Sequence, residues 1–185
     1  TPLVSINIPA SVTYIQTSTF KDCSNLTSVT FKTGSELVSI ATTAFQETSI
    51  TSIEIPEKVT SIGSSAFYKC SRLASVTFTA GSELLTIWDA AFRETALTSI
   101  EFPEKITEIK SSAFRETAIT SIVVPASVTN IGQHAFEQCS SLTIVTFIES
   151  TNWTNGITIG SYAFQYTAAL AKVFIKDGQK LDGTA

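Results

Sequence analysis

The sequence predicts a solenoid, a fold in which short coils of chain stack on one another. Seven phenylalanines recur at a near-constant stride, with intervals of 25, 22, 25, 22, 22 and 28 residues. They are Phe20, Phe45, Phe67, Phe92, Phe114, Phe136 and Phe164. Alanine precedes every one except Phe20, which follows Thr19. A repeat in this length range indicates a solenoid, in which each coil contacts only the coils before and after it.

Each coil is expected to open with a half-buried strand. In the coil that starts at Ile50, polar and apolar residues alternate over Ser52-Ile53-Glu54-Ile55, the pattern of a strand with one buried face. Proline then ends the strand because it has no N–H group to donate to the ladder. This position is held by Pro9, Pro56, Pro103 and Pro125. Longer turns replace the proline at residues 32–36 and 79–83 and account for the 25-residue intervals, and an insertion around 148–156 accounts for the interval of 28.

The second half of each coil is expected to return toward the next strand. Residues 59–62 form a short extended piece that points two more aliphatic side chains inward. Ala66 and Phe67 then begin a short helical turn, in which alanine is small enough to let the next coil approach. Glycine precedes this turn at Gly63, Gly132 and Gly160, where we expect backbone angles that other residues disfavour. The apolar side chains of one coil cannot offset the entropy of ordering it, so the coils must fold by stacking.

The three cysteines occupy one position of the repeat. Cys23, Cys70 and Cys139 each follow the repeat phenylalanine by three residues, where other coils have threonine. The nearest two are two coils apart, about 10 Å at the usual strand spacing, and a disulfide needs Cα atoms within about 7 Å. We therefore expect three unpaired and mostly buried thiols.

Composition excludes several classes of partner. The chain has 185 residues, a formal net charge of −4 and only 12 Lys and Arg, so a nucleic-acid partner is not expected, because such binding requires clustered positive charge. No apolar run approaches the roughly 18 residues of a membrane helix, and no membrane insertion is expected. The chain begins at Thr1 and contains no Met, which we interpret as a mature or excised fragment.

The repeat Leu-x-x-Ile-x-Ile-Pro-x-x-Val-x-x-Ile-Gly-x-x-Ala-Phe-x-x-Cys resembles the BspA-like class of leucine-rich repeats, from about Leu3 to Lys176. The coils start near residues 3, 26, 50, 73, 97, 119, 142 and 170, which makes seven coils and a partial eighth in a single domain, 1–185, of a longer protein. The resemblance implies a leucine-rich-repeat solenoid, a right-handed arc with a parallel β-sheet on its concave face and short strands and turns on its convex side. Proteins of this family are mostly surface or secreted molecules of bacteria and parasitic protists that adhere to host proteins and other microbes. They share no catalytic residue, and no cofactor is implied.

Strand residues that point away from the core form two columns on the sheet face, where solenoids commonly bind partners. The candidate ligand face is Ser28, Thr30, Ser52, Glu54, Ser75, Thr77, Ser99, Glu101, Ser121 and Thr146. The alternative is that these short polar side chains only solvate the sheet.

Two tryptophans are candidate binding aromatics, because Trp is enriched at binding hot spots. Trp88 stands where several coils have glycine and is expected to project from an outer turn, and Trp153 lies in the insertion. The alternative for both is packing over the edge of the core. Asn25 and Asn152 each begin an N-glycosylation triplet.

Catalysis is not indicated. His134, the only histidine, lies in a variable position with no recognisable acidic or cysteine partner. Glu54 and Glu101 are two coils apart in one column, roughly 9–10 Å at the strand spacing, close to the separation of about 6.5–9.5 Å in inverting glycosidases. A bare sheet offers no pocket and no reason for a raised pKa, so an enzyme is not expected.

The sequence therefore favours a non-enzymatic cell-surface or secreted protein that binds an extracellular-matrix or cell-surface protein or glycan, in adhesion to host or other cells. The main alternative is a structural stalk that presents another domain of a larger surface protein. An ice-binding surface ranks last, because Glu54 and Glu101 interrupt the ladder of Ser and Thr.

Overall fold

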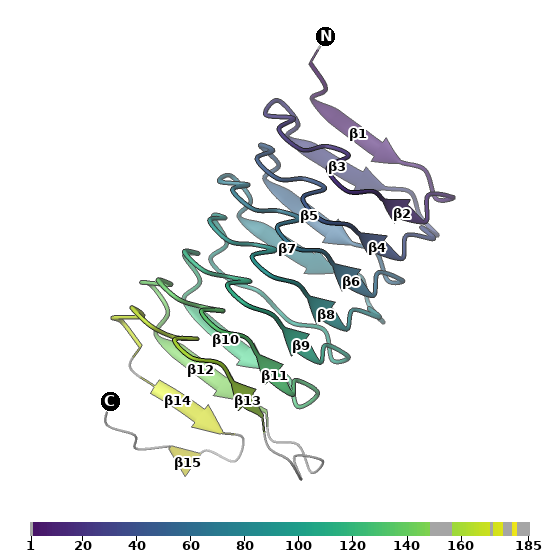
Figure 1. Cartoon of the computed structure of the whole chain (residues 1–185). Coiled ribbons are helices and arrows are strands. Elements are labelled where there is room, and N and C mark those ends of the chain that lie inside the picture. Colours follow the sequence, from purple (N-terminus) through teal and green to yellow (C-terminus); the bar gives the residue numbers. More distant parts are fainter. Residues whose placement is uncertain (1, 149–156, 171, 176–178, 181–185) are drawn as a thin grey trace.

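The structure is a computed structural model that describes residues 2–148, 157–170, 172–175 and 179–180. Among these residues every regular element is a β-strand. The chain winds as a stack of coils, with β1 and β14 at opposite ends (Figure 1). The four-residue strands are β1 (Ser5–Ile8), β3 (Ser28–Phe31), β5 (Ser52–Ile55), β7 (Ser75–Phe78), β10 (Ser121–Val124), β12 (Ile144–Phe147) and β14 (Lys172–Ile175). The predicted solenoid of parallel strands is confirmed, whereas the hand of the arc and the number of coils stay predictions.

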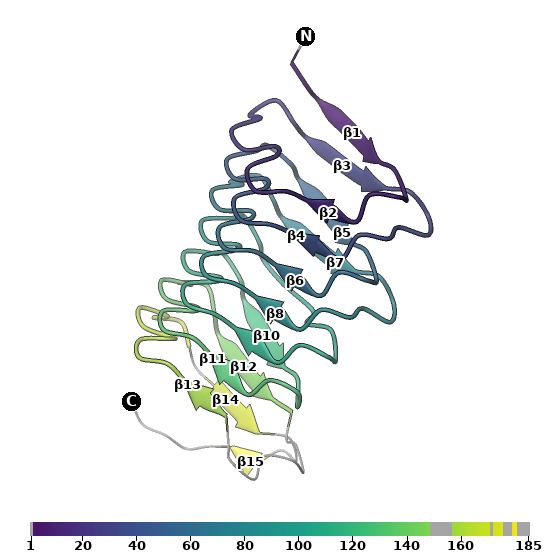
Figure 2. The same cartoon turned by 45° about the vertical axis from the view of Figure 1, so that its right-hand side comes forward.

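Seven of the two-residue strands in the described part of the chain form one continuous parallel sheet. They are β2 (Tyr14–Ile15), β4 (Ser39–Ile40), β6 (Ser61–Ile62), β8 (Thr86–Ile87), β9 (Glu108–Ile109), β11 (Asn130–Ile131) and β13 (Thr158–Ile159). Within the described residues they pair in sequence order, so that each coil adds one strand to the sheet (Figure 2). Their isoleucines point into the core from β2 to β11, which agrees with the predicted second extended piece of each coil.

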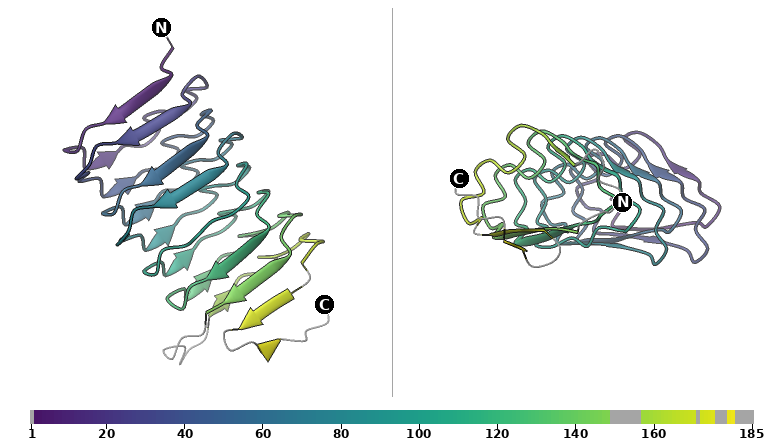
Figure 3. Two further views of the ribbon diagram at one scale, coloured as in Figure 1. Left: turned by 180° about the vertical axis from the view of Figure 1, so that it is seen from behind. Right: turned by 90° about the horizontal axis from the view of Figure 1, so that it is seen from below.

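The four-residue strands lie together on another face (Figure 3), and the parallel sheet predicted there is interrupted. This face is called the strand face below. Its paired strands are β1–β3, β5–β7 and β10–β12–β14, with β15 (Gln179–Lys180) antiparallel to β14. The coil that starts near residue 97 has no assigned strand at residues 99–102.

Proline explains where the strand face is interrupted. Where a coil has an N–H group after its strand, that group donates to the strand end of the preceding coil, as Lys32 does to Ile8 O (3.0 Å) and Thr79 does to Ile55 O (3.0 Å). Pro56, Pro103 and Pro125 hold the same position in their coils and have no N–H group to donate. The interruptions between β3 and β5 and between β7 and β10 fall at these three prolines.

The repeat phenylalanines form a continuous stack through the core. Successive rings from Phe20 to Phe164 lie 5.1–5.4 Å apart, centroid to centroid, with planes inclined by 2–12°. The five inner rings are fully buried. The aromatic spine predicted from the stride is confirmed.

The corner that holds each phenylalanine is not the short helical turn expected from the sequence. Two of its residues have positive φ, for example Ser65 at 54° and Lys69 at 56°. The amides of Ser65, Phe67 and Lys69 donate to carbonyls of the next coil at 2.8–3.0 Å, whereas the amides between them bond within their own coil. The left-handed residues turn alternate peptides outward, so the corner also joins neighbouring coils.

The glycines before the corner serve close packing and not unusual backbone angles. Gly63 does not have a positive φ, unlike Gly34 (75°) and Gly81 (82°) in the longer turns. A Cβ atom at Gly63 would lie 2.7 Å from the carbonyl carbon of Ala41 in the preceding coil, and one at Gly132 would lie 2.5 Å from the Ser111 nitrogen. The expectation about their angles was wrong, because the constraint is the backbone of the neighbouring coil.

The cysteines are unpaired, as predicted. Cys70 and Cys139 are fully buried, and Cys23 is half-buried. The Cys70 thiol lies 3.0 Å from Phe45 O and 3.3 Å from Thr48 Oγ1. Burial raises the pKa of the Cys70 thiol to about 11 and also raises the pKa of Cys139, so both are neutral at physiological pH.

Candidate functional site

The strand face carries the two predicted columns in register. Ser52 lies opposite Ser75, and Glu54 lies opposite Thr77. The first and third residues of β1 and β3, and of β10 and β12, lie opposite each other in the same way. Nine of the ten candidate residues are exposed, and Thr146 is half-buried. The inward residues between them, such as Ile53 and Val76, are buried. The alternation that was read from the sequence therefore holds residue by residue.

The interruptions of the strand face are recesses. One of about 640 Å³ lies between the coils of β3 and β5, and one of about 660 Å³ lies between β7 and residues 99–105. A third, of about 620 Å³, lies between residues 99–104 and 121–127 and reaches Ile148. Each coincides with a proline that removes a ladder donor. The expectation of a bare sheet without a pocket was wrong.

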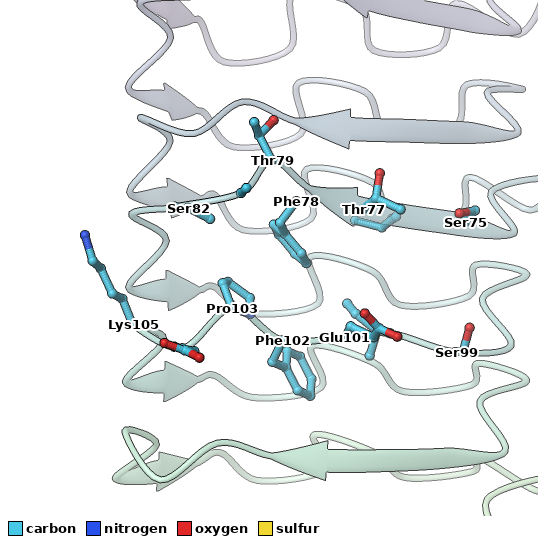
Figure 4. Close-up of a pocket in the computed structure, with 15 residues that line it drawn as sticks. Ser75, Thr77, Phe78, Thr79, Ser82, Ser99, Glu101, Phe102, Pro103 and Lys105 are labelled. Carbon is cyan, nitrogen blue, oxygen red and sulfur yellow. The ribbon is translucent and has the colours of Figure 1, made fainter.

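The recess beside β7 combines hydroxyl groups, one carboxylate and ring surfaces (Figure 4). Ser75, Thr77 and Ser99 line one side together with Glu101, and Phe78, Phe102 and Pro103 supply apolar surface. Phe78 and Phe102 are half-buried, and Phe102 packs edge-on against Phe114 at 5.6 Å. The aromatic rings are therefore held by the core.

Charge on this face is mostly negative. In the recess beside β3, Lys58 Nζ lies 2.6 Å from Glu36 Oε2, an ion pair between exposed side chains. Glu54 Oε1 accepts a long hydrogen bond from Thr79 Oγ1, at 3.5 Å. Among the described residues Glu101 has no ion-pair partner. Both column carboxylates remain available to a partner.

Trp88 lies apart from the strand face. It follows β8 of the seven-stranded sheet and is 42% exposed, which agrees with the prediction that it projects outward. Lys110 Nζ lies 5.5 Å from its ring centroid, and the same ammonium group lies 2.9 Å from Glu108 Oε2. Trp88 is thus part of a small cation–π cluster. Trp153 and Asn152 lie outside the described residues.

His134 has an acidic partner that the sequence analysis missed. Its Nδ1 atom lies 3.0 Å from Oε2 of Glu137, whose side chain is 7% exposed. Arg115 Nε lies 3.2 Å from the same carboxylate oxygen, and the His134 ring stacks on Tyr162 at 5.3 Å. The i, i+3 spacing of His134 and Glu137 was the available signal. The group lies at the phenylalanine corner and joins neighbouring coils.

Other classes of site find no support in the described part of the chain. There, no group of three or more His, Cys, Asp or Glu side chains is placed to hold a metal ion. The same residues include no helix that is long and apolar enough to cross a membrane.

Comparison with known proteins agrees with the geometry. The model of the BspA-type leucine-rich-repeat region matches six copies, over residues 1–86 and 78–183. The chain belongs to this family. As a BspA-type repeat protein it is similar in fold to the pneumococcal vaccine antigen PcpA, with a TM-score of 0.67 and 23% identity over 92% of this chain and 50% of that one. No functionally curated protein matches it in sequence.

Two further solved structures share the BspA-type fold. The leucine-rich-repeat protein of T. pallidum has a TM-score of 0.57 at 21% identity, over 95% of this chain and 74% of that one. A leucine-rich cell surface protein of Faecalibacterium prausnitzii has a TM-score of 0.51 at 24% identity, over 94% of this chain and 60% of that one. The chain thus spans about half the length of PcpA and three fifths of the F. prausnitzii protein.

Proposed function

We propose that this BspA-type repeat protein is a non-enzymatic cell-surface or secreted protein that binds a partner on its strand face, in adhesion to host or other cells. The observation that carries the proposal is the strand face itself. Its exposed columns of hydroxyl and carboxylate side chains are held in register by a buried core, and recesses interrupt it at the proline positions. Rigid scaffolds that position such groups are typical of repeat proteins that bind.

The similar proteins support a location outside the cell. One is described as a vaccine antigen and another as a cell surface protein. The partner is expected to be an extracellular-matrix or cell-surface protein or glycan, since the acidic chain disfavours nucleic acid.

Direct binding by the purified chain tests the proposal. The chain would be applied to arrays of matrix proteins, glycans and whole cells, together with the variant Ser52→Arg/Ser75→Arg. Arginines at this register pair cover the strand face with long charged side chains while leaving the inward residues unchanged. A matched control places two arginines at Thr129 and Thr158, which are exposed beside β11 and in β13 of the other sheet. Loss of binding only in the strand-face variant supports the proposal, and equal binding by all three proteins contradicts it.

A stalk that presents another domain is the second candidate, supported by the elongated stack and by the longer chains of similar proteins. It predicts that the purified chain binds none of the arrayed ligands. The same experiment therefore separates the two candidates.

A further inference from the structure

Two of the three recesses are copies of each other. Residues 26–67 and 73–114 share long identical stretches, so each element of the first recess recurs 47 positions later in the second. The matching segments are Ser-Val-Thr-Phe at 28–31 and 75–78, Gly-Ser-Glu-Leu at 34–37 and 81–84, and Thr-Ser-Ile-Glu at 51–54 and 98–101. Pro-Glu-Lys follows at 56–58 and at 103–105. The repeating unit of this region is therefore a pair of coils, a long one and a proline coil.

Each recess has the same chemical parts in the same places. The strand of the long coil supplies Ser and Thr, and the proline coil supplies a second Ser and the column carboxylate, Glu54 or Glu101. A half-buried phenylalanine, Phe31 or Phe78, and a proline ring add apolar surface. The recesses differ in two respects. Phe102 lines the second recess, whereas the equivalent Ile55 does not line the first. At the lip, Lys58 pairs with Glu36 in the first, and Lys105 forms no ion pair with a described residue in the second.

Backbone groups also line the recesses. β3 pairs with β1 and not with β5, and β7 pairs with β5 and with no strand on its other side. The peptide groups on those open edges have no ladder partner, and backbone N–H and C=O groups seek one. A strand cannot be added between β3 and β5, because these two strands still contact each other across the gap and an inserted strand needs roughly 5 Å of space on each side. A ligand of this recess therefore lies over the gap, on the strand face, and not between the strands.

We propose that the two recesses are equivalent subsites for a neutral glycan that runs along the stack of coils, which rests on the proposed binding role of the strand face. Sugar hydroxyls both donate and accept hydrogen bonds, and so match a lining of carboxylate, hydroxyl and backbone groups. The C–H face of a sugar ring matches the phenylalanine and proline surfaces. The glycan is neutral because carboxylates outnumber ammonium groups by one in each recess, and this net negative charge disfavours an anionic chain. The groups are Glu36, Glu54 and Glu57 against Lys32 and Lys58 in the first recess, and Glu101 and Glu104 against Lys105 in the second.

The spacing of the subsites favours a polymer with a regular repeat. Equivalent atoms of the two recesses are two coils apart, about 10 Å at the strand spacing, which is close to the length of a disaccharide unit in an extended glycan. A polysaccharide presents the same groups at every unit, so one chain can occupy both subsites. Two linked binding events raise the affinity through effective concentration, by about 100-fold or more when the geometry fits.

Oligosaccharides of increasing length test the proposal. Chito- and cello-oligosaccharides of two, four and six units would be titrated into the full chain by calorimetry. We expect the six-unit glycan of at least one series to bind about 100-fold more tightly than its two-unit glycan. Glu54→Gln and Glu101→Gln should each remove most of this length dependence, and Glu47→Gln, at a phenylalanine corner, should leave it unchanged. Circular dichroism would establish that each variant is folded.

The outcomes separate this proposal from the proposed function. Affinity that does not rise with length, or absence of binding in both series, overturns the glycan subsites. If matrix proteins or cells then still bind and Glu54→Gln/Glu101→Gln weakens that binding, the strand face remains the binding surface with a different occupant. Binding of an Arg- and Lys-rich peptide that falls steeply with salt would identify a cationic peptide as that occupant and would equally overturn the glycan. Binding to cells that no strand-face variant affects contradicts the proposed function itself.

Discussion

Replacing a central ring of the aromatic spine should be among the most destabilising single changes. Phe92 is fully buried, and its centroid lies 5.1 Å from that of Phe67 and 5.4 Å from that of Phe114. Truncating a buried phenylalanine to alanine costs about 3–5 kcal/mol, and each aromatic pair contributes about 0.5–1.5 kcal/mol beyond the buried area. Since two pairs are lost, we expect Phe92→Ala to lower the free energy of unfolding by an amount at the upper end of the truncation range, about 4–5 kcal/mol.

The end of the spine provides the matched control. Phe20 is only half-buried and stacks on one described ring, that of Phe45 at 5.2 Å. Phe20→Ala should therefore cost about half as much as Phe92→Ala, or less. Phe92→Leu, which retains apolar volume but no ring, should fall between the two.

Urea unfolding followed by far-ultraviolet circular dichroism measures these differences. A loss of 4–5 kcal/mol approaches the whole stability of many domains, about 5–15 kcal/mol, so Phe92→Leu also keeps the test informative if the alanine variant is unfolded. The reasoning is refuted if Phe92→Ala costs less than about 1 kcal/mol, or no more than Phe20→Ala. Either result would mean that the stacked rings do not couple the coils.

Three further changes test other features. Gly63→Ala places a Cβ 2.7 Å from a backbone atom and should lower the free energy of unfolding in urea by more than about 2 kcal/mol. Gly34→Ala is the control: its Cβ would meet open space, but its φ is 75°, so the loss should be about 1 kcal/mol. Equal losses would rule out the backbone clash. Because the Cys70 pKa is raised from 9.0 to about 11, its contribution to stability is complete below pH 9 and is lost as the pH rises toward 11. Cys70→Thr should lack that loss, about 1–3 kcal/mol, and an unchanged pH profile would contradict the shift. Pro56→Ala restores an N–H group, which should be protected from hydrogen exchange as the Thr79 amide is. Rapid exchange of the new amide would mean that proline does not cause the interruption between β3 and β5.

Much of the fold could be predicted because the same pattern of buried and exposed residues recurs in each coil of the repeat. The stride of the phenylalanines predicted the stacked spine, and the alternation around Ile53 predicted which side chains are buried. The phenylalanine corner could not be predicted in the same way. Its left-handed residues, such as Ser65 and Lys69, have no glycine or asparagine to mark them, since the hydrogen bonds to the next coil decide their conformation.

The candidate site was predicted in part. The alternation of polar and apolar residues predicts the two columns, and the sequence also shows that Pro56 cannot donate to the ladder. The effect of Pro56 on the neighbouring strand could not be predicted, although the missing donor leaves the edge of β3 unpaired and a recess lies there. Predicting that effect needs the register of adjacent coils. The same register is needed to predict that Arg115 contacts the Glu137 carboxylate, which His134 also contacts.

The difference between the two sheets has a mechanical consequence. The seven-stranded sheet is hydrogen-bonded along its length, whereas strand pairing on the strand face is interrupted at three prolines. The continuous sheet resists stretching, whereas the strand face can lengthen where strand pairing is interrupted. Tension along the molecule would therefore first widen the gaps at the three prolines, and the seven-stranded sheet would keep the coils stacked in order.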